Sequence, residues 1–191
     1  METPGGCFSE GRIRWASDLS TFVSLGNALQ PFVRLLEAIA RLAPRLPQPV
    51  IVQHGHTPFR DGACRPMPFL GMNEFIEHIH EADLLIMHAG AGSIMHAVEA
   101  GKVPVVMPRR AAFGEHVNDH QVEFAQALAE TGKVIVADTP DDLARAVKEA
   151  MARQKHTREI RGGTVEGTTP PLTATIERVL KDYARQFSSE S

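Results

Sequence analysis

A glycine-rich turn between a predicted strand and a predicted helix is the clearest indication of ligand binding in this sequence. The strand-like run at residues 83–87 leads into the segment HAGAGS at residues 88–93. At such a turn the first N–H groups of the helix lack backbone partners, and the helix dipole favours negative charge. The turn predicts an anion site, to which the Ser93 hydroxyl adds a donor. A tight turn without a ligand is the structural alternative.

Polar residues downstream of the turn suggest that the anion belongs to a larger, hydroxyl-rich ligand. Glu99 lies six residues beyond Ser93 among small apolar neighbours, and a carboxylate can accept hydrogen bonds from both hydroxyls of a ribose. A second polar cluster, EHVNDHQ at residues 115–121, follows the next apolar run. Loops at the carboxyl edge of a parallel sheet face the ligand crevice. A solvated Glu99 and a helix cap at Asn118 or Asp119 are the structural alternatives.

Two other kinds of site are disfavoured by the same residues. A dinucleotide fingerprint requires a third glycine where Met95 stands, and an acid near the end of the next strand, where Arg109 and Arg110 stand. These two arginines could meet phosphate or a partner, but we interpret them as a solvated surface pair. His116 and His120 are four residues apart, but the zinc-protease pattern HExxH is absent. The sequence therefore predicts no metal site.

The elements that would position these residues alternate between strands and helices. The pattern predicts strands at residues 21–25, 50–52, 84–87, 103–107 and 133–136, and helices at 31–42, 74–82, 93–100, 117–132, 139–154 and 173–187, with a Gly- and Pro-rich loop up to residue 68. Continuous apolar strands that alternate with helices indicate a parallel sheet covered on both faces. We therefore expect an α/β fold with a doubly wound, Rossmann-like parallel sheet.

Composition limits the class of protein further. The chain has 191 residues, 43% of them hydrophobic, and its net charge of -3 provides no electrostatic footprint for nucleic acid. Two cysteines are too few for a disulfide scaffold, so we expect a cytoplasmic protein. No apolar run reaches the roughly 20 residues of a membrane span. We divide the chain into a loose leader at 1–19, a main domain at 20–155, a linker at 156–172, and a C-terminal helix and tail at 173–191.

These motifs together resemble a known family. The matching segments are HAGAGS, Glu99, GKVP at residues 101–104, PRR at 108–110, and the cluster from Glu115 to Ala125. They resemble the C-terminal, donor-binding domain of glycosyltransferase family 28, and most of all its stand-alone subunits in dolichol-linked chitobiose and bacterial exopolysaccharide synthesis. The likeness covers about residues 21–151. It implies the C-terminal half of a two-domain GT-B fold that binds a UDP-sugar without a metal or another cofactor.

The resemblance also implies roles for individual residues. Gly90, Ala91, Gly92 and Ser93 would hold the diphosphate, with His88 and Asp119 also in the donor site. Glu99 would bind the uridine ribose. His120 and Gln121 would contact the donor sugar or diphosphate and form the catalytic part of the site. Residues 69–75 would form the wall against the uracil.

The implied function is that of a donor-binding catalytic subunit in an inverting, two-component hexosyltransferase. The acceptor would be lipid-linked or a polysaccharide, and the family's N-terminal half, which binds it, is absent from this sequence. A membrane-associated partner subunit would supply that half and recruit the chain to the cytoplasmic face of a membrane, with residues 173–187 as the docking helix. The alternatives are a UDP-sugar epimerase-like enzyme and a non-catalytic UDP-sugar-binding scaffold.

Overall fold

The computed structural model describes the backbone of residues 19–161 and the side chains of residues 19–153. Its strands are β1 (Thr21–Ser24), β2 (Val50–Gln53), β3 (Cys64–Met67), β4 (Leu84–His88), β5 (Val105–Met107) and β6 (Ile135–Val136). Its α-helices are α1 (Val33–Leu42), α2 (Met72–Glu81), α3 (Ala91–Glu99), α4 (His120–Glu130) and α5 (Pro140–Arg161). Short 3-10 turns, η1 (Ala43–Arg45) and η2 (Ala111–Phe113), complete these elements.

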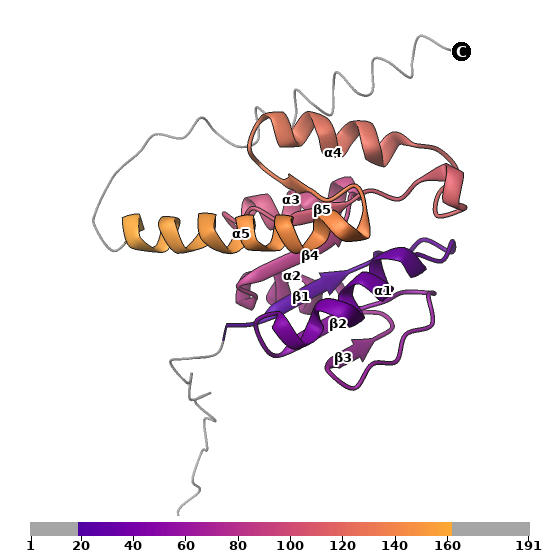
Figure 1. Ribbon diagram of the computed structural model, residues 1–191, viewed down its shortest axis with the longest axis horizontal. Helices are drawn as coiled ribbons and strands as arrows, with labels where there is room; N and C mark the ends of the chain where they lie inside the picture. The colour runs from indigo at the N-terminus through magenta and orange to yellow at the C-terminus, as the bar shows by residue number, and fades with distance from the viewer. Residues whose placement is uncertain (1–18, 162–191) are drawn as a thin grey trace, which may run out of the picture.

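The six strands form one parallel sheet in the order β3-β2-β1-β4-β5-β6. Helices α1 and α5 cover one face, and Figure 1 shows them in front of the sheet with α2 and α3 behind it. Helices α2, α3 and α4 pack a second apolar cluster on the opposite face. The predicted doubly wound α/β fold is therefore confirmed.

Apolar patterning explains why the central strands and helices form as they do. Every residue of β1 is buried, as are the first four residues of β4, because both strands lie between two layers of helices. Helix α1 instead buries one stripe, Leu35, Leu36, Ala38 and Ile39, against the sheet. These central elements fix where β1 and β4 end.

The structure corrects three predicted boundaries. Strand β3 lies inside the segment expected to be a loop; Pro66 lacks an N–H group, but an edge strand can accommodate a proline. Helix α5 extends to Arg161 and so includes the first residues of the predicted linker, because no Gly or Pro interrupts the chain before Gly162. Helix α4 begins at His120 rather than near Val117. The predicted leader up to residue 18 and the helix expected at 173–187 lie outside the described residues.

The direction of winding reverses between β1 and β4. From β1 the chain winds outward through β2 to β3, and from β4 it winds the other way through β5 to β6. In open α/β sheets, ligands bind outside the carboxyl ends of the strands at such a switch point. The loop after β1 and the turn after β4 are therefore the segments that position a site.

Candidate functional site

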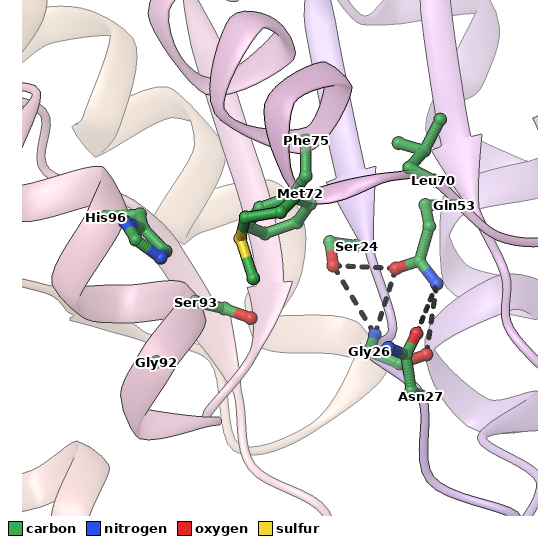
Figure 2. Close-up of a pocket in the computed structure, with 10 residues that line it drawn as sticks. All are labelled: Ser24, Gly26, Asn27, Gln53, Leu70, Met72, Phe75, Gly92, Ser93 and His96. Atoms are coloured by element: carbon green, nitrogen blue, oxygen red, sulfur yellow. Dashed lines mark hydrogen bonds between the residues drawn. The ribbon is translucent and has the colours of Figure 1, made fainter.

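A pocket of about 210 Å³ lies at the carboxyl edge of the sheet, beside this switch point. Figure 2 shows the residues that line it, which come from the ends of β1 and β2, the loop after β1, and helices α2 and α3. They are Ser24, Gly26, Asn27, Gln53, Leu70, Met72, Phe75, Gly92, Ser93 and His96. The predicted site residues Gly92 and Ser93 are therefore in the pocket wall.

The first turn of α3 presents unpaired donors to this pocket. Gly90 is the residue before the helix, and no side chain among the described residues caps it. The N–H groups of Ala91, Gly92 and Ser93 have no hydrogen-bond partner in the described part of the chain, while Ile94 N–H donates to the Gly90 carbonyl at 3.0 Å. Figure 2 shows the Ser93 hydroxyl pointing from α3 toward the side chains of the opposite wall. This end of α3 has the geometry of an anion site.

The opposite wall is organised by Gln53, a buried glutamine at the end of β2. Its amide oxygen accepts hydrogen bonds from the Ser24 hydroxyl at 2.8 Å and from Gly26 N–H at 3.1 Å. Its amide nitrogen donates to the Gly26 carbonyl at 3.1 Å. One side chain thus fixes the loop that leaves β1, and Figure 2 shows this group facing α3 across the pocket.

The third side of the pocket is apolar and comes from the segment before and within α2. Leu70, Met72 and Phe75 line it, and the Phe75 ring makes an edge contact with the His96 ring at 6.4 Å between centroids. Glu74 fixes the start of α2, since its carboxylate accepts a hydrogen bond from Gly71 N–H at 3.1 Å. Part of segment 69–75, which the resemblance places against the uracil, therefore lines this pocket.

His88 connects the two turns that flank the switch point. Its ring lies between Gly26 and Gly90, where an added Cβ would approach it within 3.0 Å at either position. Nδ1–H donates to the Ser24 carbonyl at 3.4 Å. Burial, and then the charge of Arg109, lowers the pKa of His88 from 6.5 to about 4, so the ring is neutral at pH 7. His88 therefore acts as a spacer between the two turns and does not line the pocket.

Glu99, expected to bind the ribose, is not among the residues that line the pocket but contacts one of them. It is the last residue of α3, its side chain is 54% exposed, and its carboxylate lies 3.7 Å from Nδ1 of His96. His96, one turn earlier, lines the pocket instead. Residues three apart on a helix share a face, so His96 and Glu99 are neighbours, with His96 in the pocket wall and Glu99 beside it.

The predicted residues at the start of α4 are also absent from the pocket lining. Asp119 accepts a hydrogen bond from Ala111 N–H at 2.8 Å, and the Gln121 side chain accepts one from Arg109 N–H at 3.2 Å. Both side chains thus hold the loop after β5. His120, the first residue of α4, is partly buried beside them. Asp119 occupies the N-cap position of α4, but its side chain makes no capping hydrogen bond there.

The interpretation of Arg109 as a solvated residue is wrong. Its side chain is only 1% exposed and donates to the carbonyls of Gln30 at 2.8 Å, Glu115 at 3.0 Å and Leu25 at 2.9 Å. Its guanidinium also lies 4.7 Å from the centre of the Phe32 ring. Arg109 therefore joins the loop after β1 to the loop after β5.

A buried ion pair lies beside Arg109. Arg34 of α1 contacts both oxygens of the buried Glu115 carboxylate, at 3.0 and 2.8 Å. Arg34 also donates to the carbonyls of Pro108 and Asp138, each at 2.8 Å. Glu115 accepts one more bond, from Arg110 N–H at 3.0 Å. The hydrogen bonds of Arg34 therefore connect α1 to the residues that follow β5 and β6.

His116 and His120 do not form a metal site with their neighbours. Within residues 19–153, no group of three His, Cys, Asp or Glu side chains is placed to hold a metal ion. His116 instead donates through Nδ1–H to the Asn118 side-chain oxygen at 3.0 Å. The polar cluster at residues 115–121 thus organises a loop.

Several lining residues had no role in the sequence predictions. Ser24 and Gln53 end apolar strands, and His96 lies on the helix after the glycine-rich turn. A polar residue at the end of a buried strand can indicate a ligand site, because the carboxyl ends of parallel strands meet at the edge of the sheet where ligands bind. The meeting of β1 with β4, however, depends on strand order, which periodicity alone does not specify.

The family model of the glycosyltransferase family 28 C-terminal domain matches residues 27–162. The chain belongs to this family. The match includes α1, the glycine-rich turn, the arginine–glutamate network and α4. The resemblance drawn from the sequence motifs is therefore confirmed.

Curated relatives share parts of this domain. Over 122 residues the chain is 27% identical to the UDP-N-acetylglucosamine–N-acetylmuramyl-(pentapeptide) pyrophosphoryl-undecaprenol N-acetylglucosamine transferase of Bdellovibrio bacteriovorus. The matched segment covers 62% of this chain and 32% of that protein. It is 38% identical over 71 residues to the UDP-N-acetylglucosamine transferase subunit ALG13 of Cryptococcus neoformans, covering 36% of this chain and 34% of that one. The matched segment spans about a third of the length of each.

A solved structure supports the same fold. The glycotransferase of kitacinnamycin superposes on 94% of this chain and 44% of its own, with a TM-score of 0.57 and 21% identity. The fold is that of one half of a GT-B glycosyltransferase. Among the described residues, none of the helices combines the length and apolar character that crossing a membrane requires.

The buried pair of Arg34 and Glu115 predicts a large effect on stability. Glu115→Gln should lower the free energy of unfolding in urea by about 3–5 kcal/mol, because it leaves a largely buried arginine without its counter-charge. Asp138→Asn is the matched control: its ion pair with Arg110 is more exposed to solvent than that of Glu115, and its loss should cost less than about 1 kcal/mol. Equal effects of the two substitutions would contradict the assigned role of Glu115.

The neutral His88 ring predicts a pH dependence of stability. The unfolded chain protonates this histidine near pH 6.5 and the folded chain near pH 4, so His88 has no effect above pH 6.5. Between pH 6.5 and 4 it should remove up to about 3 kcal/mol of stability as the pH falls. Urea unfolding of His88→Gln should show a correspondingly flatter pH profile. The exposed His80→Gln should retain the wild-type profile, and identical profiles for all three proteins would refute the prediction.

Proposed function

We propose that this chain is the donor-binding half of an inverting glycosyltransferase that moves a hexose-type sugar from a UDP-sugar to a lipid-linked or polysaccharide acceptor. The observation that carries the proposal is the uncapped first turn of α3, which opens into the pocket at the switch point of a family 28 domain. The relatives named above, a UDP-N-acetylglucosamine transferase and a subunit of one, support a nucleotide-sugar donor.

The pocket walls suggest how the nucleotide would bind. The free N–H groups of Ala91, Gly92 and Ser93 would receive the diphosphate, since they combine unpaired donors with the positive end of a helix dipole. The apolar surface of Leu70 and Phe75 would lie against the uracil. The ribose would then lie nearest to His96 on α3.

We assign the ribose hydroxyls to His96, with Glu99 behind it. Because Glu99 lies beside Nδ1 of His96, its carboxylate can orient the ring so that the other nitrogen faces the pocket. This arrangement retains the ribose role expected for this helix and transfers the direct contact from Glu99 to His96. His120 and Gln121, at the start of α4, remain the proposed contacts of the donor sugar.

In the proposed reaction an acceptor hydroxyl attacks C1 of the sugar from the face opposite UDP. A bond forms between the acceptor oxygen and C1 while the bond from C1 to the diphosphate oxygen breaks, and the hydroxyl proton passes to a base on the partner chain. Negative charge grows on the leaving diphosphate. Fixed donors at the α3 N-terminus would stabilise that charge without having to reorganise during the step.

The distribution of exposed apolar residues supports a second chain at this edge. Among the described residues, the exposed large hydrophobic side chains beyond β1 lie at the carboxyl edge of the sheet, on the loops after β1, β3 and β5 or the first turns of α1 and α2. They are Leu29, Val33, Phe69, Met72, Phe113 and Val117. We call this set the apolar rim, and propose that it contacts the acceptor-binding domain of a membrane-associated partner.

The nucleotide assignment predicts a selective loss of affinity. UDP should bind the full chain in calorimetry and raise its melting temperature. His96→Ala should weaken UDP binding roughly 5- to 150-fold, the usual consequence of leaving polar groups unpaired. Its affinity for 2′-deoxy-UDP should change much less. Glu99→Gln should have a smaller effect in the same direction.

The exposed His80→Ala serves as the matched control for this measurement, because His80 lies on α2 away from the pocket lining. It should bind UDP like the wild type. The absence of UDP binding to the wild-type chain would refute the donor-binding function. Equal losses for UDP and 2′-deoxy-UDP in His96→Ala would refute only the ribose assignment.

The partner assignment predicts that the residues of the apolar rim outside the pocket matter only in the complex. The double substitution Phe113→Ser and Val117→Ser should leave UDP binding unchanged, because neither residue lines the pocket. With the partner present, transfer of labelled sugar to membrane lipid should fall at least tenfold, and co-purification of the two chains should weaken. Full transfer by the double variant would contradict the interface. UDP binding with no transfer in any reconstitution would indicate a non-catalytic binding subunit.

A further inference from the structure

We propose that Arg109 is a positioning residue of the donor site. Its buried cation holds the loop after β1 to the loop after β5 and places positive charge beneath the turn from β4 into α3. The inference rests on the donor-binding function proposed above, because the charge is assigned to the diphosphate. Arg109 does not line the pocket, so any effect of Arg109 on the ligand is indirect.

The bonds of Arg109 define the two loops that it joins. One guanidinium nitrogen donates to the carbonyls of Gln30 and Glu115, and the other donates to the carbonyl of Leu25. Leu25 directly follows β1 and leads into Gly26 of the pocket wall. The backbone N–H of Arg109 donates to Gln121 at 3.2 Å. One residue therefore connects a pocket wall to the proposed sugar contacts on α4.

The order of the strands shows where the side chain of Arg109 must lie. Strand β4 lies between β1 and β5 in the sheet, and all three run parallel. A side chain that begins after β5 and bonds to a carbonyl just beyond β1 has to cross the carboxyl end of β4. That end continues through His88 into Gly90, the residue before α3. The cation thus lies close to the turn proposed to bind the diphosphate.

Arg109 makes no direct ion pair among the described residues, although the charge of the nearby Glu115 carboxylate raises its pKa. Glu115 pairs with Arg34, and Asp138 pairs with Arg110, whereas the described acceptors of the Arg109 guanidinium are carbonyl oxygens. Its Nε is buried without a hydrogen-bond partner in the described part of the chain. A buried cation with an unpaired donor is costly, and apolar side chains often replace buried charges without loss of stability. Ligand binding gives a physical reason for a charge at this position.

The electrostatic reach of Arg109 is visible at His88. Burial lowers the pKa of Arg109 to about 10, against the opposing effect of the Glu115 charge, so the guanidinium remains charged at pH 7. After burial, that charge is the next cause of the lowered pKa of His88, whose ring contacts the Gly90 turn. A field that disfavours a proton on His88 favours a diphosphate at the helix beside it.

The test compares the affinity for UDP, which carries the charged diphosphate, with the affinity for uridine, which lacks it. Affinities for UDP by calorimetry and for uridine by NMR titration are measured on the full chain and on Arg109→Gln, Arg109→Lys and Arg110→Gln. Arg109→Gln should lower the ratio of UDP to uridine affinity at least tenfold. Arg109→Lys retains the charge and should hold the ratio within threefold of the wild type, even if its melting temperature falls. Arg110→Gln removes a half-buried neighbouring charge and should also stay within threefold.

Three results would overturn the proposal. Equal losses of UDP and uridine affinity in Arg109→Gln would assign the residue a structural role alone. A ratio lowered in Arg109→Lys to below a tenth of the wild-type value would show that charge at this position is not what matters, and this variant decides the matter if Arg109→Gln does not fold. An equal fall in Arg110→Gln would show a general surface effect. Failure of the wild-type chain to bind UDP would instead refute the proposed function.

Discussion

The carboxylate of Glu115 is the point at which the loops of the ligand-binding edge are held together. It bonds to Arg34 on α1 and to the backbone after β5, and Arg34 reaches from there to carbonyls after β5 and β6. Loops that carry binding residues need a rigid support. In this protein that support is a buried ion pair whose members bond to backbone groups of several loops, so displacing one loop breaks bonds to the others.

The second constraint is steric and involves His88. Its ring fills the space between Gly26 and Gly90, the turns from which the two facing pocket walls begin. Any side chain at these glycines would collide with the ring, and Gly26 also has a φ of 71°, which favours glycine. The separation of the two walls is thus set by one imidazole. Glycine is therefore required at Gly90 by the packing of the His88 ring, independently of any ligand.

The sequence predicted those features that depend on local pattern. The alternation of elements and the turn before Ser93 follow from periodicity and glycine placement, and both were confirmed in the structure. Strand β3 was not predicted, because an exposed edge strand containing Pro66 lacks the apolar run of a central strand. Arg109 and Gln53 owe their roles to contacts between residues far apart in sequence, which no local pattern records. Glu99 was chosen for its chemistry, and its place beside the pocket-lining His96 is known only from the structure.

The open shape of the site explains why the proposed chemistry would need a second chain. Helix donors and a buried cation stabilise a leaving diphosphate strongly only where water is excluded, because water screens charge. The pocket of about 210 Å³ is smaller than the roughly 300–1,000 Å³ of a typical ligand site, and its first-turn residue Gly92 faces open space. In that case this chain would supply the electrostatic groups, and the partner would exclude water from the same site. In such an arrangement the donor binds before catalysis becomes possible, and arrival of the acceptor domain both excludes water and delivers the nucleophile.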